Sequence, residues 1–316
     1  MTAAPDVAVH WELGSDRPRE DHGFFGPDSP TWKVWTSPTA LIGFQRSVVL
    51  EHFEPHLAAA VADAAGIYRD PRGRMDGTLA YFLIVATADS RTAVEASEHL
   101  QKVHARSKGL DPVTGTRYSA NDPASQLWIH VTGWHSVLKC YEVFGPGPLS
   151  RAEEDRYWSE CVIAAELQTV NPAEVPRSRD EVRQYFARMR PTLCTSERAQ
   201  RAMHYLLRTP RSGSSNMQFW AISRLLPPAT VATLPRWMRE LGQFDQPGIV
   251  DAAYRPLVSA GMRIAGIPAV ETTILRRSLP MTRTALRDFH KAKAPLRPVT
   301  VTPAEAKERY GRRATA

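Results

Sequence analysis

An all-α fold is predicted for this chain by three observations. Apolar residues recur with helical spacing, helix-capping residues precede many of these segments, and no alternating pattern is strong enough to build a sheet. The clearest case follows Asp122, where large apolar residues stand at i, i+4, i+7, i+11 and i+14 from Leu127. With 316 residues and 43% hydrophobic residues, the chain is long enough for one large domain with a sizeable core.

Three regions are expected along the chain. Residues 1–36 are rich in Pro, Gly, Asp and Trp and are predicted to form an N-terminal arm. Residues 37–293 should form the helical domain, and residues 294–316, with prolines and charges, an extended C-terminal tail. The arm carries aromatic residues through which it could pack, namely Phe24, Phe25, Trp32 and Trp35.

Helix-capping and helix-breaking residues define the expected helices of the first half of the chain. Ser37-Pro38 reads as an N-cap and N1 pair, Pro55 breaks the helix that follows, and residues 70–73 read as a turn. The expected helices run from Pro38 to about Phe53, His56 to Ala65, Met75 to Ala88, Ser90 to a C′ glycine at Gly109, and Asp122-Pro123 to Gly145.

Two capping boxes open the second half, at residues 150–153 and 178–181, and predict helices to about Thr169 and Met189. Further helices are expected at about 196–208, 214–226, 235–242, 249–265 and 283–292. No internal repeat is present, so one helical domain is the predicted architecture.

Charge and cysteine content restrict the function. The net charge is +7, and no aromatic-basic motif accompanies the basic residues, so nucleic acid is not an expected partner. The three cysteines, Cys140, Cys161 and Cys194, form no Cys-x-x-Cys pair, and a reduced, cytoplasmic compartment is expected. The N-terminus does not read as a signal peptide, and no apolar run reaches the roughly 18 residues of a membrane span.

Two histidines fall on helical patterns. His130 stands three residues after Leu127 and one before Val131, so it points to the buried face, where an imidazole needs a polar partner or a metal. His135 falls on a more mixed face. His104 flanks the apolar stripe of the helix that begins at Ser90.

Familiar catalytic motifs are absent from the sequence, which has no His-Glu-x-x-His, Gly-x-Ser-x-Gly, Gly-x-Gly-x-x-Gly, Walker or Glu-x-x-His pattern. His52 and His56 are four apart, but Pro55 between them argues against a shared helical face. A buried histidine with few carboxylates nearby suits haem, which needs one imidazole, an apolar slot and cations for its propionates. A hydrogen-bonded core histidine is the alternative for both His130 and His104.

Three ordered runs resemble one family: His104-Ala-Arg-Ser-Lys-Gly109, Tyr118-Ser-Ala-Asn-Asp-Pro123 and Leu127-Trp-Ile-His130. They are similar to the patterns His-x-x-Val-x-Gly, Tyr-x-Ala-x-Asp-Pro and Trp-Val-His of oxygenases of the MpaB and latex-clearing rubber oxygenase type. Flanking landmarks extend the resemblance over about residues 40–270. They are His56-Leu-Ala-Ala-Ala-Val61, Asp70-Pro71 with Arg74 and Thr78, Pro148-Leu-Ser150, and Leu225-Leu-Pro227.

The resemblance implies a globin-like helical domain that binds haem b and carries out oxidative chemistry with dioxygen. It makes His130 the proximal iron ligand and His104 the catalytic residue on the distal side, where it could hydrogen-bond dioxygen or relay a proton. It also makes Arg74, Arg106 and Trp128 candidates for contacts with the cofactor, and Lys108 a candidate for propionate or substrate.

Two positions depart from the rubber oxygenases, which carry lysine at the position of His104 and arginine at that of Gln101, so polyisoprene is not the expected substrate. The resulting expectation is a haem b-dependent oxygenase or oxidase that acts on an apolar small molecule with dioxygen and a redox partner. A haem-binding sensor or electron-transfer protein without turnover is the first alternative. A helical interaction protein with no cofactor, whose basic tail binds the partner, is the second.

Overall fold

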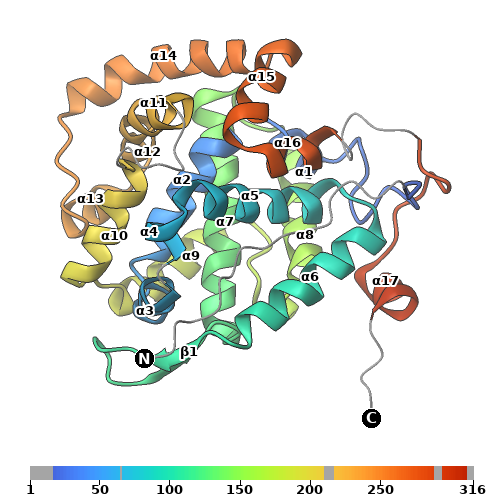
Figure 1. The fold of residues 1–316 in the computed structure, drawn as a ribbon, viewed down its shortest axis with the longest axis horizontal. Helices are drawn as coiled ribbons and strands as arrows, with labels where there is room; N and C mark the ends of the chain where they lie inside the picture. The colour runs from blue at the N-terminus through green and yellow to red at the C-terminus, as the bar shows by residue number, and fades with distance from the viewer. Residues whose placement is uncertain (1–16, 65, 210–216, 288–293, 312–316) are drawn as a thin grey trace.

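The computed structural model describes residues 17–64, 66–209, 217–287 and 294–311. Within these residues nearly all regular structure is helical, which confirms the predicted all-α class (Figure 1). The first part of the chain forms α1 (Pro30–Trp35), α2 (Ala40–Glu51), α3 (Pro55–Ala64), α4 (Gly66–Arg69), α5 (Pro71–Thr87), α6 (Ser90–His104), β1 (Lys108–Leu110), β2 (Arg117–Ser119) and α7 (Pro123–Phe144). The second part forms α8 (Arg151–Ala165), η1 (Pro172–Glu174), α9 (Arg179–Met189), η2 (Arg190–Thr192), α10 (Glu197–Leu207), α11 (Met217–Leu225), α12 (Pro227–Ala232), α13 (Arg236–Leu241), α14 (Gly248–Ala265), α15 (Pro268–Ser278), α16 (Pro280–Ala285) and α17 (Pro303–Tyr310).

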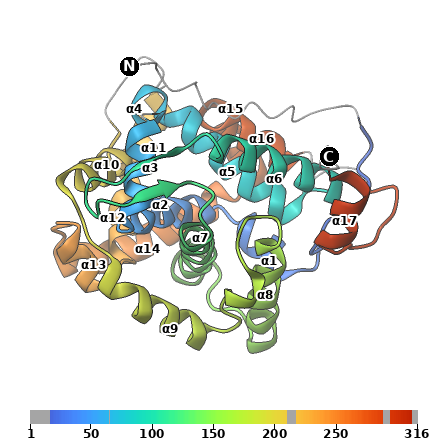
Figure 2. The same cartoon turned by 90° about the horizontal axis from the view of Figure 1, so that it is seen from below.

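Helix α7 runs through the middle of the molecule, and Figure 2 shows it end-on with other helices around it. Helix α2 packs closely along it, because Gly43 has no side chain: a Cβ there would lie 2.6 Å from the Cα atom of Val137. The indole N–H of Trp128 on α7 also donates to the carbonyl oxygen of Leu50 on α2, at 3.2 Å. The α2–α7 pair therefore forms a rigid centre for the fold.

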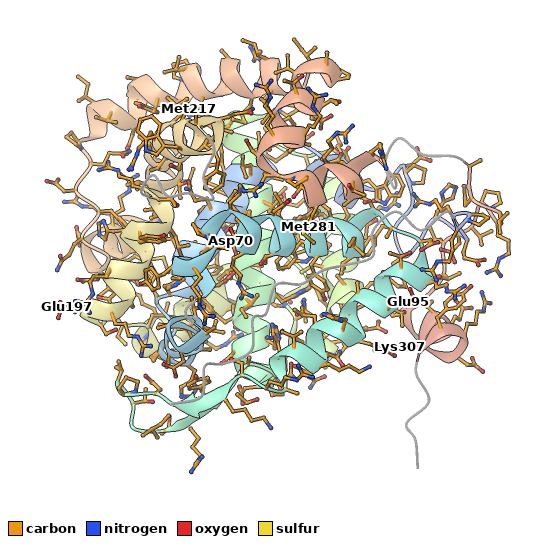
Figure 3. All side chains as sticks on the ribbon, viewed as in Figure 1. Asp70, Glu95, Glu197, Met217, Met281 and Lys307 are labelled. Carbon is orange, nitrogen blue, oxygen red and sulfur yellow. The ribbon has the colours of Figure 1, made fainter. Side chains whose placement is uncertain are left out.

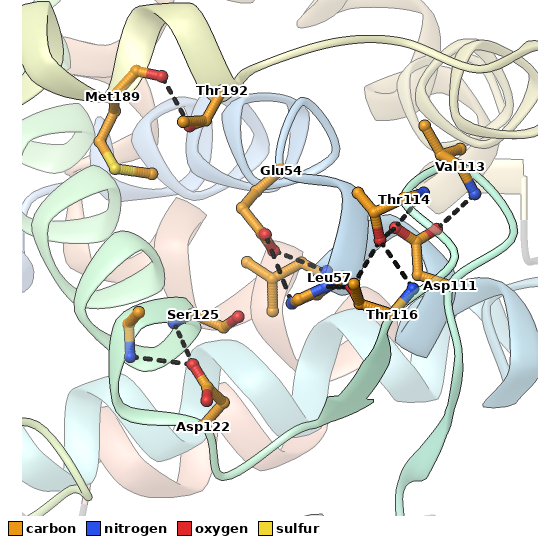
Figure 4. Close-up of polar contacts among 12 residues, drawn as sticks. Glu54, Leu57, Asp111, Val113, Thr114, Thr116, Asp122, Ser125, Met189 and Thr192 are labelled. Atoms are coloured by element: carbon orange, nitrogen blue, oxygen red, sulfur yellow. Dashed lines mark hydrogen bonds and ion pairs between the residues drawn. The ribbon is translucent and has the colours of Figure 1, made fainter.

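The predicted caps are confirmed at several helices. The Asp122 carboxylate accepts the backbone N–H groups of Ala124 and Ser125, at 3.0 and 3.2 Å, and Pro123 occupies the first turn of α7 (Figure 4). At the start of α8, Ser150 and Glu153 form the reciprocal capping box that the sequence predicts.

Four local predictions are wrong. Ser37-Pro38 is not the N-cap and N1 pair of a helix, because α2 begins at Ala40 with Thr39 as its N-cap. Residues 70–73 are not a turn but the start of α5, where the Asp70 carboxylate accepts the N–H of Gly73 at 3.0 Å; Asp70 is labelled in Figure 3. Helix α6 ends at His104, and Gly109 lies in β1, which pairs antiparallel with β2. Within the expected tail, residues 303–310 form α17, because Thr302 and Glu305 make a further capping box.

Residues from both ends of the described chain pair with each other. The N–H of Leu296 donates to the carbonyl oxygen of Arg19 at 2.8 Å, and that of Val301 to Gly23 at 3.0 Å. We call this pairing of residues 19–23 with residues 296–301 the terminal clasp. The aromatic residues predicted to pack the arm are all buried, namely Phe24, Phe25, Trp32 and Trp35.

Parts of three predicted helices, residues 65, 214–216 and 288–292, lie outside the described residues. Among the described helices, none combines the length and the apolar character that crossing a bilayer requires.

Candidate functional site

A large cavity lies between α2, α5 and α11, and we call it the main cavity. Its empty volume is about 900 Å³, a figure that includes open solvent at its mouth. Its walls are mostly apolar, with contributions from Leu41, Phe44, Val48, Val61, Ile67, Met75, Leu206, Phe219, Ile222 and Leu226. Apolar walls of this kind suit an apolar ligand.

The main cavity has one strongly polar region, formed by Glu51, His52 and Arg74. The Glu51 carboxylate accepts a hydrogen bond from the Ser47 hydroxyl at 2.7 Å. Burial raises the pKa of Glu51 to about 7, although the Ser47 bond and the Arg74 charge both act in the opposite direction. Two other polar side chains of the wall already have hydrogen-bond partners. Gln45 accepts from the Thr230 hydroxyl, and the Ser223 hydroxyl donates to the carbonyl oxygen of Trp220.

Arg74 is a half-buried cation with no carboxylate in contact. Within the described residues its guanidinium forms no hydrogen bond or salt bridge, and only the more distant charge of Glu51 favours its ionised form. Burial therefore lowers the pKa of Arg74. Five N–H donors without a protein acceptor make Arg74 suited to an anionic group of a ligand.

His52 lies at the C-cap of α2 and is 2% exposed. Its Nδ1 atom lies 2.7 Å from the carbonyl oxygen of Val48, which can only accept, so Nδ1 carries the proton. The Nε2 atom is buried and has no hydrogen-bond partner. Burial lowers the pKa of His52, so the ring is neutral and Nε2 keeps a free lone pair.

A second cavity, of about 710 Å³, adjoins the main cavity at Leu41, Ile222 and Leu226. It is almost wholly apolar and extends between α5 and the helices α14 to α16. The two cavities share these three wall residues, and the polar region of the main cavity lies at the end of α2.

Two of the predicted site residues lie together beside the main cavity. Arg74 lines it, and His104 lies close enough to Arg74 for that charge to lower the pKa of His104 further, to about 4, after the larger effect of burial. His104 Nδ1 lies 3.4 Å from the Gln126 amide nitrogen, and the ring also bonds to Asn121. His104 is therefore a neutral, hydrogen-bonded group behind Arg74.

His130 lies elsewhere. It is fully buried, as its stripe predicts, but it faces α8, where its Nε2–H donates to the carbonyl oxygen of Cys161 at 2.8 Å. Its Nδ1 atom is buried without a partner. His130 lines neither of the two cavities, and its nearest aromatic contact is the ring of Trp134, 5.8 Å away between centroids.

The remaining predicted residues are also apart from the cavities. Trp128 is buried against α2 and the rings of Tyr185 and Phe186. Arg106 and Lys108 are exposed, beyond the end of α6. The structure thus brings together Arg74 and His104 but not His130, Trp128, Arg106 or Lys108.

Sequence reasoning missed Glu51 and His52. The signal was the helical spacing of Leu41, Gln45, Val48 and His52, at i, i+4, i+7 and i+11, all of which line the main cavity. The prediction that His52 and His56 do not share a helical face is confirmed, because His52 ends α2 and His56 lies in α3.

The fold and this cavity define a helical protein with a mostly apolar cavity. A family model described as "ER-bound oxygenase mpaB/B'/Rubber oxygenase, catalytic domain" matches residues 32–266, which is most of the chain. The chain belongs to this oxygenase family. No curated protein and no solved structure shows a significant match to the chain.

Proposed function

We propose that this protein is a haem b-dependent oxygenase that uses dioxygen to oxidise an apolar small molecule. The observation that carries the proposal is the main cavity, which combines apolar walls with an imidazole and an unpaired arginine at one end. Within the described residues, no three His, Cys, Asp or Glu side chains form a group that could hold a metal ion by themselves. A haem, by contrast, takes only one axial nitrogen from the protein.

The residues of the main cavity fit such a group. Haem b would supply the redox chemistry with dioxygen, and a redox partner would supply electrons. Arg74 would bind a propionate, because its half-buried guanidinium has no carboxylate in contact. The apolar walls would exclude water from the reacting substrate.

The substrate class follows from the second cavity. Its lining is almost wholly apolar, and it shares the wall residues Leu41, Ile222 and Leu226 with the main cavity. An apolar molecule would gain about 25 cal/mol for each Å² of surface that it buries there. The resemblance makes His130 the axial ligand, and this stays a prediction that spectra of variants can test.

The test is a titration of the purified protein with ferric haemin, followed by absorption spectroscopy. We expect a Soret band distinct from that of free haemin, at one haem per chain. With a reductant, oxygen uptake should then depend on an apolar substrate from a panel of terpenoid and aromatic lipids. Absence of any haemin binding would contradict the proposal, and haem binding without oxygen uptake on any substrate would favour a sensor or electron-transfer protein.

A further inference from the structure

We infer that the outer side of helix α14 is a docking surface for an anionic lipid bilayer. Figure 1 shows α14 along the upper edge of the molecule, with α15 following it. The docking requires no bound cofactor, so it can be tested separately from the proposed function.

An apolar stripe follows the outer side of α14. Its members stand at i, i+4, i+8, i+11 and i+15 and therefore share one face of the helix. They are Ile249, Ala253, Leu257, Ala260 and Ile264. Ile249 is 79% exposed, Leu257 65% and Ile264 57%. Single exposed apolar side chains are ordinary, but a continuous stripe about 22 Å long indicates an interaction surface.

The opposite side of α14 packs against the protein. Val258 is buried there in an apolar cluster with Ile42 of α2 and Phe144 of α7, and Tyr254 and Met262 pack against the same cluster. Helix α14 thus has two apolar sides, and the described residues cover only the inner one. The outer stripe is not needed to hold α14 on the fold.

The exposed charges of α14 and α15 are all positive. The arginines of these two fully described helices are exposed, namely Arg255, Arg263, Arg276 and Arg277. Their acidic residues, Asp251 and Glu271, are half-buried, and Asp251 pairs with Arg239 at 2.7 Å. The nearest exposed carboxylate in the described sequence is Asp245, before α14 begins. Arginines beside an apolar stripe suit the headgroup region of an anionic bilayer, where they meet phosphate groups while the aliphatic side chains reach the acyl boundary.

A second copy of the chain fits this surface less well. A symmetric dimer brings the same patch of both subunits together. The exposed arginines of one α14 would then approach those of the other, and like charges oppose such an interface. An anionic bilayer has the complementary charge and also offers an apolar phase for the stripe.

The second cavity lies on the inner side of the same two helices. Met262 and Ala265 of α14 line it, as do Ile274 and Leu275 of α15. If this cavity receives an apolar substrate, which rests on the proposed function, a bilayer is the phase in which such a substrate accumulates. A docked α14 would hold the cavity beside that phase.

The inference is tested by co-flotation of the purified full-length chain with lipid vesicles. One set of vesicles is phosphatidylcholine alone, and the other contains phosphatidylglycerol as well. We expect binding to the anionic vesicles that weakens as salt is added. Leu257→Glu and Ile264→Glu should each lower the partition constant by about 10-fold or more, because each removes a large apolar side chain from the lipid contact. Leu110→Glu is the matched control, because Leu110 is 60% exposed but lies in β1, and it should keep the wild-type binding.

Two further variants separate lipid contact from damage to the helix. Leu257→Trp should bind at least as well as the wild-type chain, because an indole is favoured at the bilayer interface. Arg263→Gln should weaken binding to the anionic vesicles by about fivefold and leave binding to phosphatidylcholine unchanged.

Three results would overturn the inference. They are a wild-type chain that does not float with anionic vesicles, equal weakening in Leu110→Glu and Leu257→Glu, and a wild-type dimer that Leu257→Glu converts to a monomer while vesicle binding stays the same. Vesicle binding by a chain that takes up no haemin would support the docking surface and contradict the proposed function, so the two failures are distinguishable.

Discussion

Burial sets the protonation state of the central histidines. The pKa of His130 is lowered to about 4 by burial, against the opposing effect of its bond to the Cys161 carbonyl. The pKa of His104 is lowered to about 4 by burial and then by the charge of Arg74. Both rings are therefore neutral at pH 7, and His104 can accept a proton but cannot act there as a cationic acid.

The buried state of His130 predicts a pH dependence of stability. Above about pH 6.5 the ring is neutral in both states and contributes nothing to the pH dependence. As the pH falls from about 6.5 to 4, only the unfolded chain binds the proton, so the free energy of unfolding should fall by about 3 kcal/mol in total. Urea unfolding of the haem-free protein at several pH values, beside His130→Gln, measures this loss. The prediction would be contradicted if the free energy of unfolding fell equally with pH in the wild-type chain and in His130→Gln over this range.

Arg74 predicts a second residue-scale effect. Arg74→Gln removes the unpaired cation from the main cavity. It should weaken haemin binding by about 10- to 100-fold, because that factor corresponds to the free energy of a hydrogen bond to a charged group. Arg106→Gln is the matched control, because Arg106 is exposed and outside the cavity wall. Haemin dissociation rates measure both, and an equal effect of the two substitutions would contradict the role of Arg74.

Single residues were partly predictable from the sequence. Periodicity alone identified His130 as buried, because helical spacing fixes which face a residue occupies. Which ring nitrogen is free depends on contacts with carbonyls of other residues, and spacing does not determine those contacts. The cavity beside His52 was missed for the same reason: it is formed by helices distant in sequence.

At the scale of elements, the α2–α7 crossing gives the sharpest prediction. Gly43→Ala would place a Cβ 2.6 Å from the backbone of Val137, which cannot move aside, and should destabilise the fold by about 1–3 kcal/mol. Gly133→Ala on α7 is the matched control, because its Cβ would meet only ordinary contacts, the nearest at 3.7 Å. That variant should be neutral or gain up to about 1 kcal/mol of helix propensity. Chemical unfolding measures both variants. Equal free energies of unfolding for Gly43→Ala and Gly133→Ala would show that α2 and α7 can move apart without a loss of stability.

Helices were easier to predict than their ends or the hairpin. Asp122-Pro123 and the Ser150 capping box act within one turn, so the sequence alone identifies them. The β1–β2 pairing depends on support from outside the hairpin: the Tyr118 hydroxyl donates to Asp63 of α3, at 2.6 Å. Such a contact is not visible in local patterns, so the sequence did not predict these two strands.

At the scale of the whole molecule, residues beyond the family match complete the fold. The buried carboxylate of Asp76 on α5 accepts the backbone N–H groups of Met281 and Thr282, at 2.9 and 2.8 Å, and so holds α16. Met281, labelled in Figure 3, lies next to α5.

Asp76→Asn should therefore cost about 1–3 kcal/mol, because an amide offers one acceptor oxygen in place of two and leaves a buried N–H unpaired. Asp70→Asn is the control, since asparagine caps a helix about as well as aspartate does. Thermal and urea unfolding measure both variants, and a loss of stability in Asp70→Asn as large as in Asp76→Asn would contradict this account.

The terminal clasp has a consequence for how the chain is made. A ribosome releases residues 19–23 well before their partners at residues 296–301, which follow all the helices of the family match. Until those partners emerge, the main-chain groups of residues 19–23 lack these hydrogen bonds. The clasp therefore closes late, between segments far apart in the sequence, and chains stalled before residue 296 would leave the ribosome with residues 19–23 unpaired by it.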